Sequence, residues 1–128
     1  MKLKSLFVIS AILGTVLGLG FFFAPEVVMS TFGVDAGEAH QHTARNFGSA
    51  MIGLAVISWV ARNSKNSVAR RAIVFGLFIY FIFGSISIIS FQLQGNVSNN
   101  GWFIIVLHLL LMVGFGYNLI SSWNSVEQ

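Results

Sequence analysis

A few polar side chains stand inside or beside long apolar runs, where they could do chemistry. Arg45 lies about one residue into one run, and His108 lies six residues into another. An ionisable residue within a membrane span is a candidate functional site, because burying it in lipid is costly. The pair predicts a binding site for an anionic or hydrogen-bond-accepting group, with Ser49, Glu26 and Gln92 at a reachable depth. The alternatives are that Arg45 reaches lipid phosphate or a nearby carboxylate, and that His108 is a hydrogen-bonded core residue.

The sequence holds no set of residues with a recognisable catalytic pattern. It has no cysteine, which excludes thiol redox chemistry, disulfides and thiolate metal sites. A haem held by His108 would need a second ligand, and only His40 and His42 could supply it. These two form an i,i+2 pair in a polar stretch, which is a weak metal motif because no third ligand lies nearby. We therefore expect no catalytic residue, no metal and no cofactor, with haem the one cofactor left open. Tyr80, Tyr117 and Asn118 are expected to hydrogen-bond across helices.

Four long apolar runs must position these side chains. The chain is 55% hydrophobic and only 9% charged, whereas a soluble domain carries about 25% charged residues. A helix needs about 20 apolar residues to cross a ~30 Å hydrocarbon core. The runs predict an all-α membrane protein, a single domain over residues 1–128 in which four transmembrane helices form an antiparallel bundle. The predicted spans cover residues 5–24, 44–61, 72–91 and 102–122.

The segment between the first two spans is the one connection with room for structure. Pro25 suits the first turn of a helix, and the apolar residues after it predict a short interfacial helix over residues 25–32 that Gly33 ends. Residues 34–41 are polar and predict a turn.

Glycines recur at helical spacing within three of the spans. Small residues let helix backbones approach closely in lipid. We expect helix packing at five of them: Gly14, Gly18, Gly48, Gly53 and Gly84. All of these except Gly84 are expected to bring the first two spans into close contact. A dimer seam or a cavity wall is the alternative use of such faces.

The basic residues are distributed as in an oriented membrane protein. Six of the seven Lys and Arg residues lie before the first span or within residues 62–71, which four spans place on one side. The positive-inside rule makes that side cytoplasmic, together with both termini. The net charge of +3 is therefore read as topology, and no nucleic-acid partner is expected.

Several short motifs resemble those of small bacterial four-span membrane proteins of unknown function, loosely like the DoxX group. They are Ala24-Pro25-Glu26, Phe32-Gly33-Val34, Arg45-Asn46-Phe47-Gly48, and Gly53 with Trp59-Val60-Ala61-Arg62. The resemblance covers most of the chain and implies a four-helix bundle in a bacterial inner membrane. It supplies no activity, so no functional residue is carried over.

Three functions are compatible with these observations. The leading expectation is a non-enzymatic protein that acts through helix contacts, as an accessory subunit or a homo-oligomer. Its partners would be membrane lipids, other membrane subunits or itself. The alternative is binding or transport of a small polar or amphipathic molecule in an outward-facing pocket near Arg45 and His108. The third is a haem-binding or oxidoreductase subunit.

Overall fold

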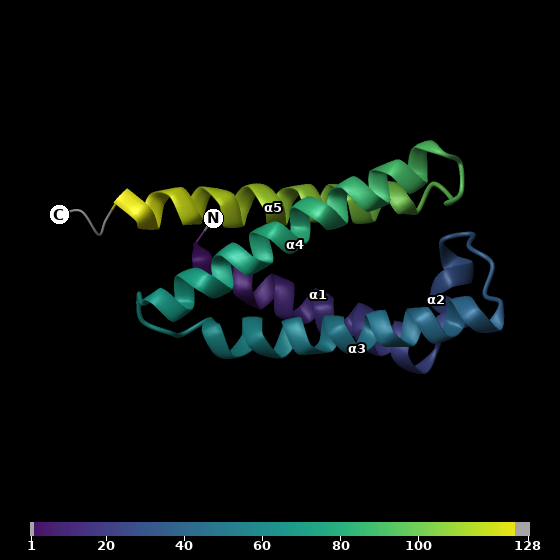
Figure 1. Cartoon of the computed structure of the whole chain (residues 1–128), viewed down its shortest axis with the longest axis horizontal. Coiled ribbons are helices and arrows are strands. Elements are labelled where there is room, and N and C mark those ends of the chain that lie inside the picture. The colour runs from purple at the N-terminus through teal and green to yellow at the C-terminus, as the bar shows by residue number, and fades with distance from the viewer. Residues whose placement is uncertain (1, 125–128) are drawn as a thin grey trace.

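The computed structural model describes residues 2–124, with side chains as far as Ser121, and that part of the chain is all helix and loop (Figure 1). Four helices are long and apolar enough to cross a membrane, and a fifth is short. The helices are α1 (Leu3–Phe23), α2 (Pro25–Thr31), α3 (Glu38–Ala61), α4 (Val68–Leu93) and α5 (Gly101–Asn124). The predicted fold class, four long antiparallel helices with a short helix in the first connection, is confirmed.

Two of the long helices, α3 and α4, begin four or more residues before the apolar runs that predicted them. Helix α3 begins at Glu38 and not at position 44, so the expected polar turn over residues 34–41 is helical from position 38 onward. Glu38 is an acidic residue in the first turn, where it favours a helix N-terminus. The Gln41 side chain donates to the Ala36 carbonyl at 2.7 Å. Helix α4 begins at Val68 because Ser67 caps it, its hydroxyl accepting from the Arg70 backbone N–H at 3.2 Å.

The long helices associate as two pairs, α1 with α3 and α4 with α5 (Figure 1). We call the end with the N-terminus of α1 and the α3–α4 linker the basic end, because it carries Lys2, Lys4 and the Arg and Lys residues of 62–71. The opposite end, with α2 and the α4–α5 loop, is the α2 end. The two pairs approach each other near the basic end and diverge toward the α2 end.

An aromatic and aliphatic core holds the two pairs together in the half nearer the basic end. Its buried members are Leu6, Phe7, Ala61, Val74, Leu77, Phe81, Leu111 and Phe115. The rings of Phe81 and Phe115 stack with centroids 5.8 Å apart, and Phe7 lies 5.7 Å from Phe115. Leu6 fits against Gly114, where a Cβ atom would lie 2.6 Å from the Leu6 Cδ2 atom. These contacts fix α1 against α5.

At the α2 end, hydrogen bonds between loops join the two pairs. The Ser98 backbone N–H donates to the Phe32 carbonyl at 2.8 Å, and the Asn100 side chain donates to the Thr31 carbonyl at 2.9 Å. Gly33, with φ of 72°, ends α2 beside Ser98. We call this set of contacts the α2–loop bridge.

Three of the five predicted packing glycines form the contact between α1 and α3. A Cβ atom on Gly48 would lie 2.6 Å from the Gly18 carbonyl oxygen, one on Gly18 would lie 2.9 Å from Ile52, and one on Gly14 would lie 3.1 Å from the Ala55 Cβ atom. Gly53 does not belong to this contact, because a Cβ there meets nothing within 4 Å. Five residues turn a helix by about 500°, so Gly53 lies about 140° away from the face of Gly48.

Candidate functional site

A cavity of about 580 Å³ lies between the two helix pairs in the half nearer the α2 end. Its wall is mainly aliphatic and aromatic, and representative lining residues are Leu17, Phe21, Phe32, Phe47, Ile88 and Phe91. Polar groups enter it from His40, Thr43, Tyr80, Ser87 and His108. Among the described residues that line it there is no Lys, Arg, Asp or Glu. Ligand sites in proteins commonly measure about 300–1,000 Å³ and are mostly apolar with a few polar groups.

The cavity follows from the way the two pairs are held. The aromatic core joins them in one half, the α2–loop bridge joins them at the far end, and between these points the pairs stand apart. Ala44 is a small residue on the wall and fills little of that space.

The His108 ring is fixed at the deep end of this large cavity. Its Nδ1 lies 3.0 Å from the Ile104 carbonyl oxygen, and a carbonyl only accepts, so Nδ1 carries the hydrogen. In the neutral ring, Nε2 is then an acceptor. A Cβ atom on Gly84 would lie 3.0 Å from His108 Cδ2, so the glycine at this position leaves room for the imidazole. Phe81 packs edge-on against the ring at 5.4 Å between centroids.

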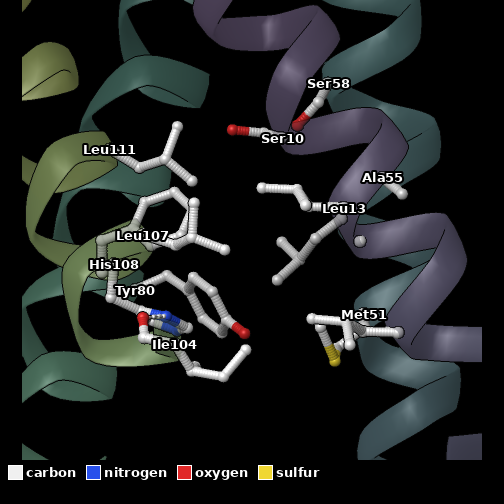
Figure 2. A pocket seen from close by; sticks show the side chains of 14 residues that line it. Ser10, Leu13, Met51, Ala55, Ser58, Tyr80, Ile104, Leu107, His108 and Leu111 are labelled. Atoms are coloured by element: carbon white, nitrogen blue, oxygen red, sulfur yellow. Dashed lines mark hydrogen bonds between the residues drawn. The ribbon is translucent and has the colours of Figure 1, made fainter. Parts of the chain in front are cut away.

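Tyr80 stands beside His108 with its hydroxyl directed into the space between the pairs (Figure 2). The two ring centroids are 6.3 Å apart. No residue in the described part of the chain hydrogen-bonds the Tyr80 hydroxyl. The deep end of the large cavity thus presents one free hydroxyl and one imidazole nitrogen.

A second, small cavity of about 50 Å³ continues from this deep end toward the basic half. Tyr80 and His108 line both cavities. Ser10 of α1 and Ser58 of α3 add their hydroxyls to the small one (Figure 2). Both serines are buried, with 7% and 1% of their surface exposed, and neither Oγ atom has a hydrogen-bond partner among the described residues.

Three of the predicted site residues lie away from both cavities. Arg45, Ser49 and Glu26 are exposed, and none of them lines a cavity wall. The Ser49 hydroxyl donates to the Arg45 carbonyl at 3.0 Å. Within residues 2–124 the Arg45 guanidinium forms no ion pair, so the expected carboxylate partner is not found.

The structure therefore does not bring Arg45 and His108 together. The face of α3 that lines the large cavity runs through His40, Ala44, Phe47 and Met51. Arg45 follows Ala44 directly and is turned from that face by about 100°.

Gln92 is buried, and its side chain hydrogen-bonds the α4–α5 loop. Its side-chain nitrogen lies 3.2 Å from the Val97 carbonyl and 3.4 Å from the Ser98 carbonyl. This amide supports the segment that forms the α2–loop bridge, and Gln92 does not line the large cavity.

Possible metal or haem ligands are few. The described residues contain no group of three or more His, Asp or Glu side chains suited to a metal ion. His40 and His108 line the same large cavity, and His40 Nδ1 lies 3.1 Å from the Asp35 carbonyl. His42 is exposed, beside Asn46 at 3.3 Å.

Two residues of the site were given a different role, or none, by the sequence. Tyr80 was expected to hydrogen-bond across helices, and its hydroxyl is instead free in the cavity. Ser58 carried no prediction. A single hydroxyl residue within an apolar run, as at Ser10 and Ser58, is the sequence signal that could have indicated this site. It is a weak signal, because such hydroxyls commonly bond the backbone of their own helix.

Comparison with known proteins gives one match. Residues 7–128 match the model of a family described as a domain of unknown function, DUF8292. No curated protein and no solved structure matches the chain. The match makes no link to the DoxX group, so that resemblance stays a prediction.

Proposed function

The chain belongs to the DUF8292 family, and we propose that it binds an uncharged, largely apolar molecule in the large cavity between its two helix pairs. One observation carries this proposal: a space of about 580 Å³ with an apolar wall and no charged lining residue among those described. Burying apolar surface contributes about 25 cal/mol per Å². A charged ligand would be left unpaired in such a wall, at a large desolvation cost.

The proposed ligand would come from the lipid phase. Four helices long and apolar enough to span a bilayer surround the cavity, and their outer surfaces carry exposed apolar residues such as Val16, Val60, Phe83 and Val113. A molecule concentrated in the bilayer needs little affinity to occupy the site.

Photolabelling tests the proposal. The protein in phospholipid vesicles is irradiated with hexadecane carrying a mid-chain diazirine, and labelled residues are mapped by mass spectrometry. We expect labels on Phe47, Ile88 and Phe91, which line the cavity. Ser87→Phe narrows the cavity and should reduce these labels. Ser90→Phe is the matched control, because Ser90 is exposed on the same helix and does not line the cavity. Equal labelling in both variants would overturn the proposal.

The contact-based function, as accessory subunit or homo-oligomer, has a weaker basis in the geometry. Gly14, Gly18 and Gly48, for which a dimer seam was the alternative to packing within the chain, make their contacts within one chain. Native mass spectrometry in mild detergent distinguishes the two functions. A stable oligomer or partner subunit with no bound small molecule would favour the contact function.

The haem-binding function has one point in its favour. His40 and His108 line the same cavity, and the Nδ1 atom of each faces a backbone carbonyl, which leaves Nε2 of each as the potential ligand. A Soret band in the absorbance spectrum of the pure protein would show that it binds haem. Haem would then take the place of the apolar ligand in the proposed function.

For the cellular setting we propose a bacterial inner membrane with the basic end in the cytoplasm. The support is the clustering of Lys2, Lys4, Arg62, Lys65, Arg70 and Arg71 at one end of the long helices. Arg62 also packs its guanidinium over the Trp59 ring, 3.7 Å from the centroid, an arrangement typical of a membrane interface.

A further inference from the structure

The small cavity adjoins the large one. Leu17, Met51, Tyr80, Ile104 and His108 line both, so a molecule seated in the large cavity can extend into the small one between these residues. The volume of about 50 Å³ exceeds the ~10–15 Å³ that one water needs. It therefore has room for a small polar group and none for a long apolar chain.

The two serines that line it leave their hydroxyls without a partner among the described residues, a state they share with Ser85, which lines neither cavity. The hydroxyls of Thr31, Thr43 and Ser49 donate to backbone carbonyls four residues earlier, at 2.8–3.1 Å. This back-bonding is the usual state of a hydroxyl on a helix. Ser10 and Ser58 make no such bond, although both are more than nine-tenths buried. A buried hydroxyl is costly without a partner, so both point to an occupant of the small cavity.

The polar groups around this space are neutral and include both hydrogen-bond donors and an acceptor. Ser10, Ser58 and Tyr80 supply hydroxyls that can donate, and His108 Nε2 can accept. No Lys, Arg, Asp or Glu lines either cavity in the described part of the chain. A carboxylate or an ammonium head would lack a counter-charge there, whereas a hydroxyl or a carbonyl carries no charge that would be left unpaired.

We infer that the small cavity receives the hydroxyl or carbonyl head of a neutral amphipathic ligand whose apolar body fills the large cavity. The head hydrogen-bonds Ser10 and Ser58, and Tyr80 and His108 flank it where the two cavities meet. This inference rests on the proposed function and names the chemical class of its ligand.

Two matched photoprobes test the inference separately from the proposed function. One is hexadecanol with a mid-chain diazirine, and the other is the hexadecane probe, which differs only by the hydroxyl. Each is titrated against the protein in phospholipid vesicles, and labelling of the large cavity gives its apparent affinity. Hexadecanol should bind more tightly than hexadecane. The Ser10→Ala/Ser58→Ala variant should lose about 2- to 12-fold in hexadecanol affinity for each hydroxyl that bonds the head. Its affinity for hexadecane should not change.

Ser5→Ala/Ser90→Ala is the control variant, because both serines are exposed and line neither cavity. It should bind both probes as the unmodified protein does. If the double variant does not fold, Ser10→Ala and Ser58→Ala are titrated singly.

The outcomes separate the two ideas. Equal binding of both probes, unaffected by the serine substitutions, would overturn the inference and leave the small cavity to water alone, while the proposed function would stand. Labelling of the cavity by hexadecanol and not by hexadecane would keep the polar subsite and overturn the apolar basis of the proposed function. Cavity labelling by neither probe would overturn both.

Discussion

Tyr80 of α4 and His108 of α5 lie side by side where the two cavities meet, with ring centroids 6.3 Å apart. Gly84, one turn further along α4, leaves room for the imidazole, and the bond from His108 Nδ1 to the Ile104 carbonyl holds the ring in place. The Tyr80 hydroxyl remains free in the described structure. These two residues therefore place polar groups where the two cavities meet.

Tyr80→Phe should weaken binding of the hexadecanol probe without destabilising the protein. The hydroxyl has no partner among the described residues, so its loss breaks no hydrogen bond seen in the structure. If it bonds the ligand head, hexadecanol affinity should fall by about 2- to 12-fold. Photolabelling titration measures this change, and hexadecane should bind as before.

Tyr117→Phe is the matched control for Tyr80. Tyr117 is 67% exposed on α5 and lines neither cavity, so its substitution should change neither probe. A loss of hexadecanol affinity of the same size in both variants would refute the role given to Tyr80.

Alanine substitutions at Gly48 and Gly53 should move stability in opposite directions. A Cβ on Gly48 would lie 2.6 Å from the Gly18 carbonyl oxygen, whereas one on Gly53 meets nothing within 4 Å. Overpacking typically costs about 1–3 kcal/mol, so Gly48→Ala should lower the midpoint of thermal unfolding in detergent. Gly53→Ala should raise it, because alanine favours a helix interior by about 0.5–1 kcal/mol over glycine.

Both glycines lie on α3, so the pair controls for effects of the helix itself. Equal shifts of the unfolding midpoint would mean that α1 and α3 do not pack at Gly48 as closely as the structure has them.

The spans could be predicted from the sequence because length and hydrophobicity alone decide whether a helix can cross a bilayer. The start of α3 could not be predicted in the same way. Residues 38–43 are mostly polar and look like a turn, yet they continue the helix, with Gln41 bonded to the Ala36 carbonyl. Gly53 was misplaced because its spacing from Gly48 does not keep the two residues on one face.

The cavities could not be predicted, because they depend on contacts between residues far apart in the chain. Phe7 against Phe115 joins the pairs in one half, and Ser98 bonded to Phe32 joins them at the other end. Arg45 attracted attention as the charge nearest to a span. The phase of α3 relative to the cavity, which places Ala44 on the wall and not Arg45, becomes visible only when the helices are packed.

The basic end should lie in the cytoplasm. Reporter fusions after residue 128 and in the α3–α4 linker at Ser67 should both give the cytoplasmic signal, because four spans put both positions on the side that carries six of the seven basic residues. A fusion in the α4–α5 loop at Asn99 is the control and should give the opposite signal. Opposite signals at Ser67 and at the C-terminus would contradict the four-span topology.

Weakening the α2–loop bridge should speed ligand exchange. The Asn100 side chain donates to the Thr31 carbonyl at 2.9 Å, and the Ser98 N–H donates to the neighbouring Phe32 carbonyl. These bonds join the two helix pairs at the end where the large cavity lies. Asn100→Ala removes one of these bonds. Its loss should destabilise the closed arrangement of the two pairs by about 0.5–1.5 kcal/mol, which lowers the ratio of closed to open protein by about 2- to 12-fold.

The measurement is the rate at which bound hexadecanol photoprobe is displaced by excess unlabelled hexadecanol, sampled by irradiation after increasing delays. Asn100→Ala should raise this rate and leave the cavity wall itself unchanged, because Asn100 does not line it. Asn99→Ala is the control, since the Asn99 side chain forms no hydrogen bond in the described structure. An unchanged rate in Asn100→Ala would mean that the ligand enters between the helices without parting the bridge. A raised rate confined to Asn100→Ala would make the bridge the closure of the site.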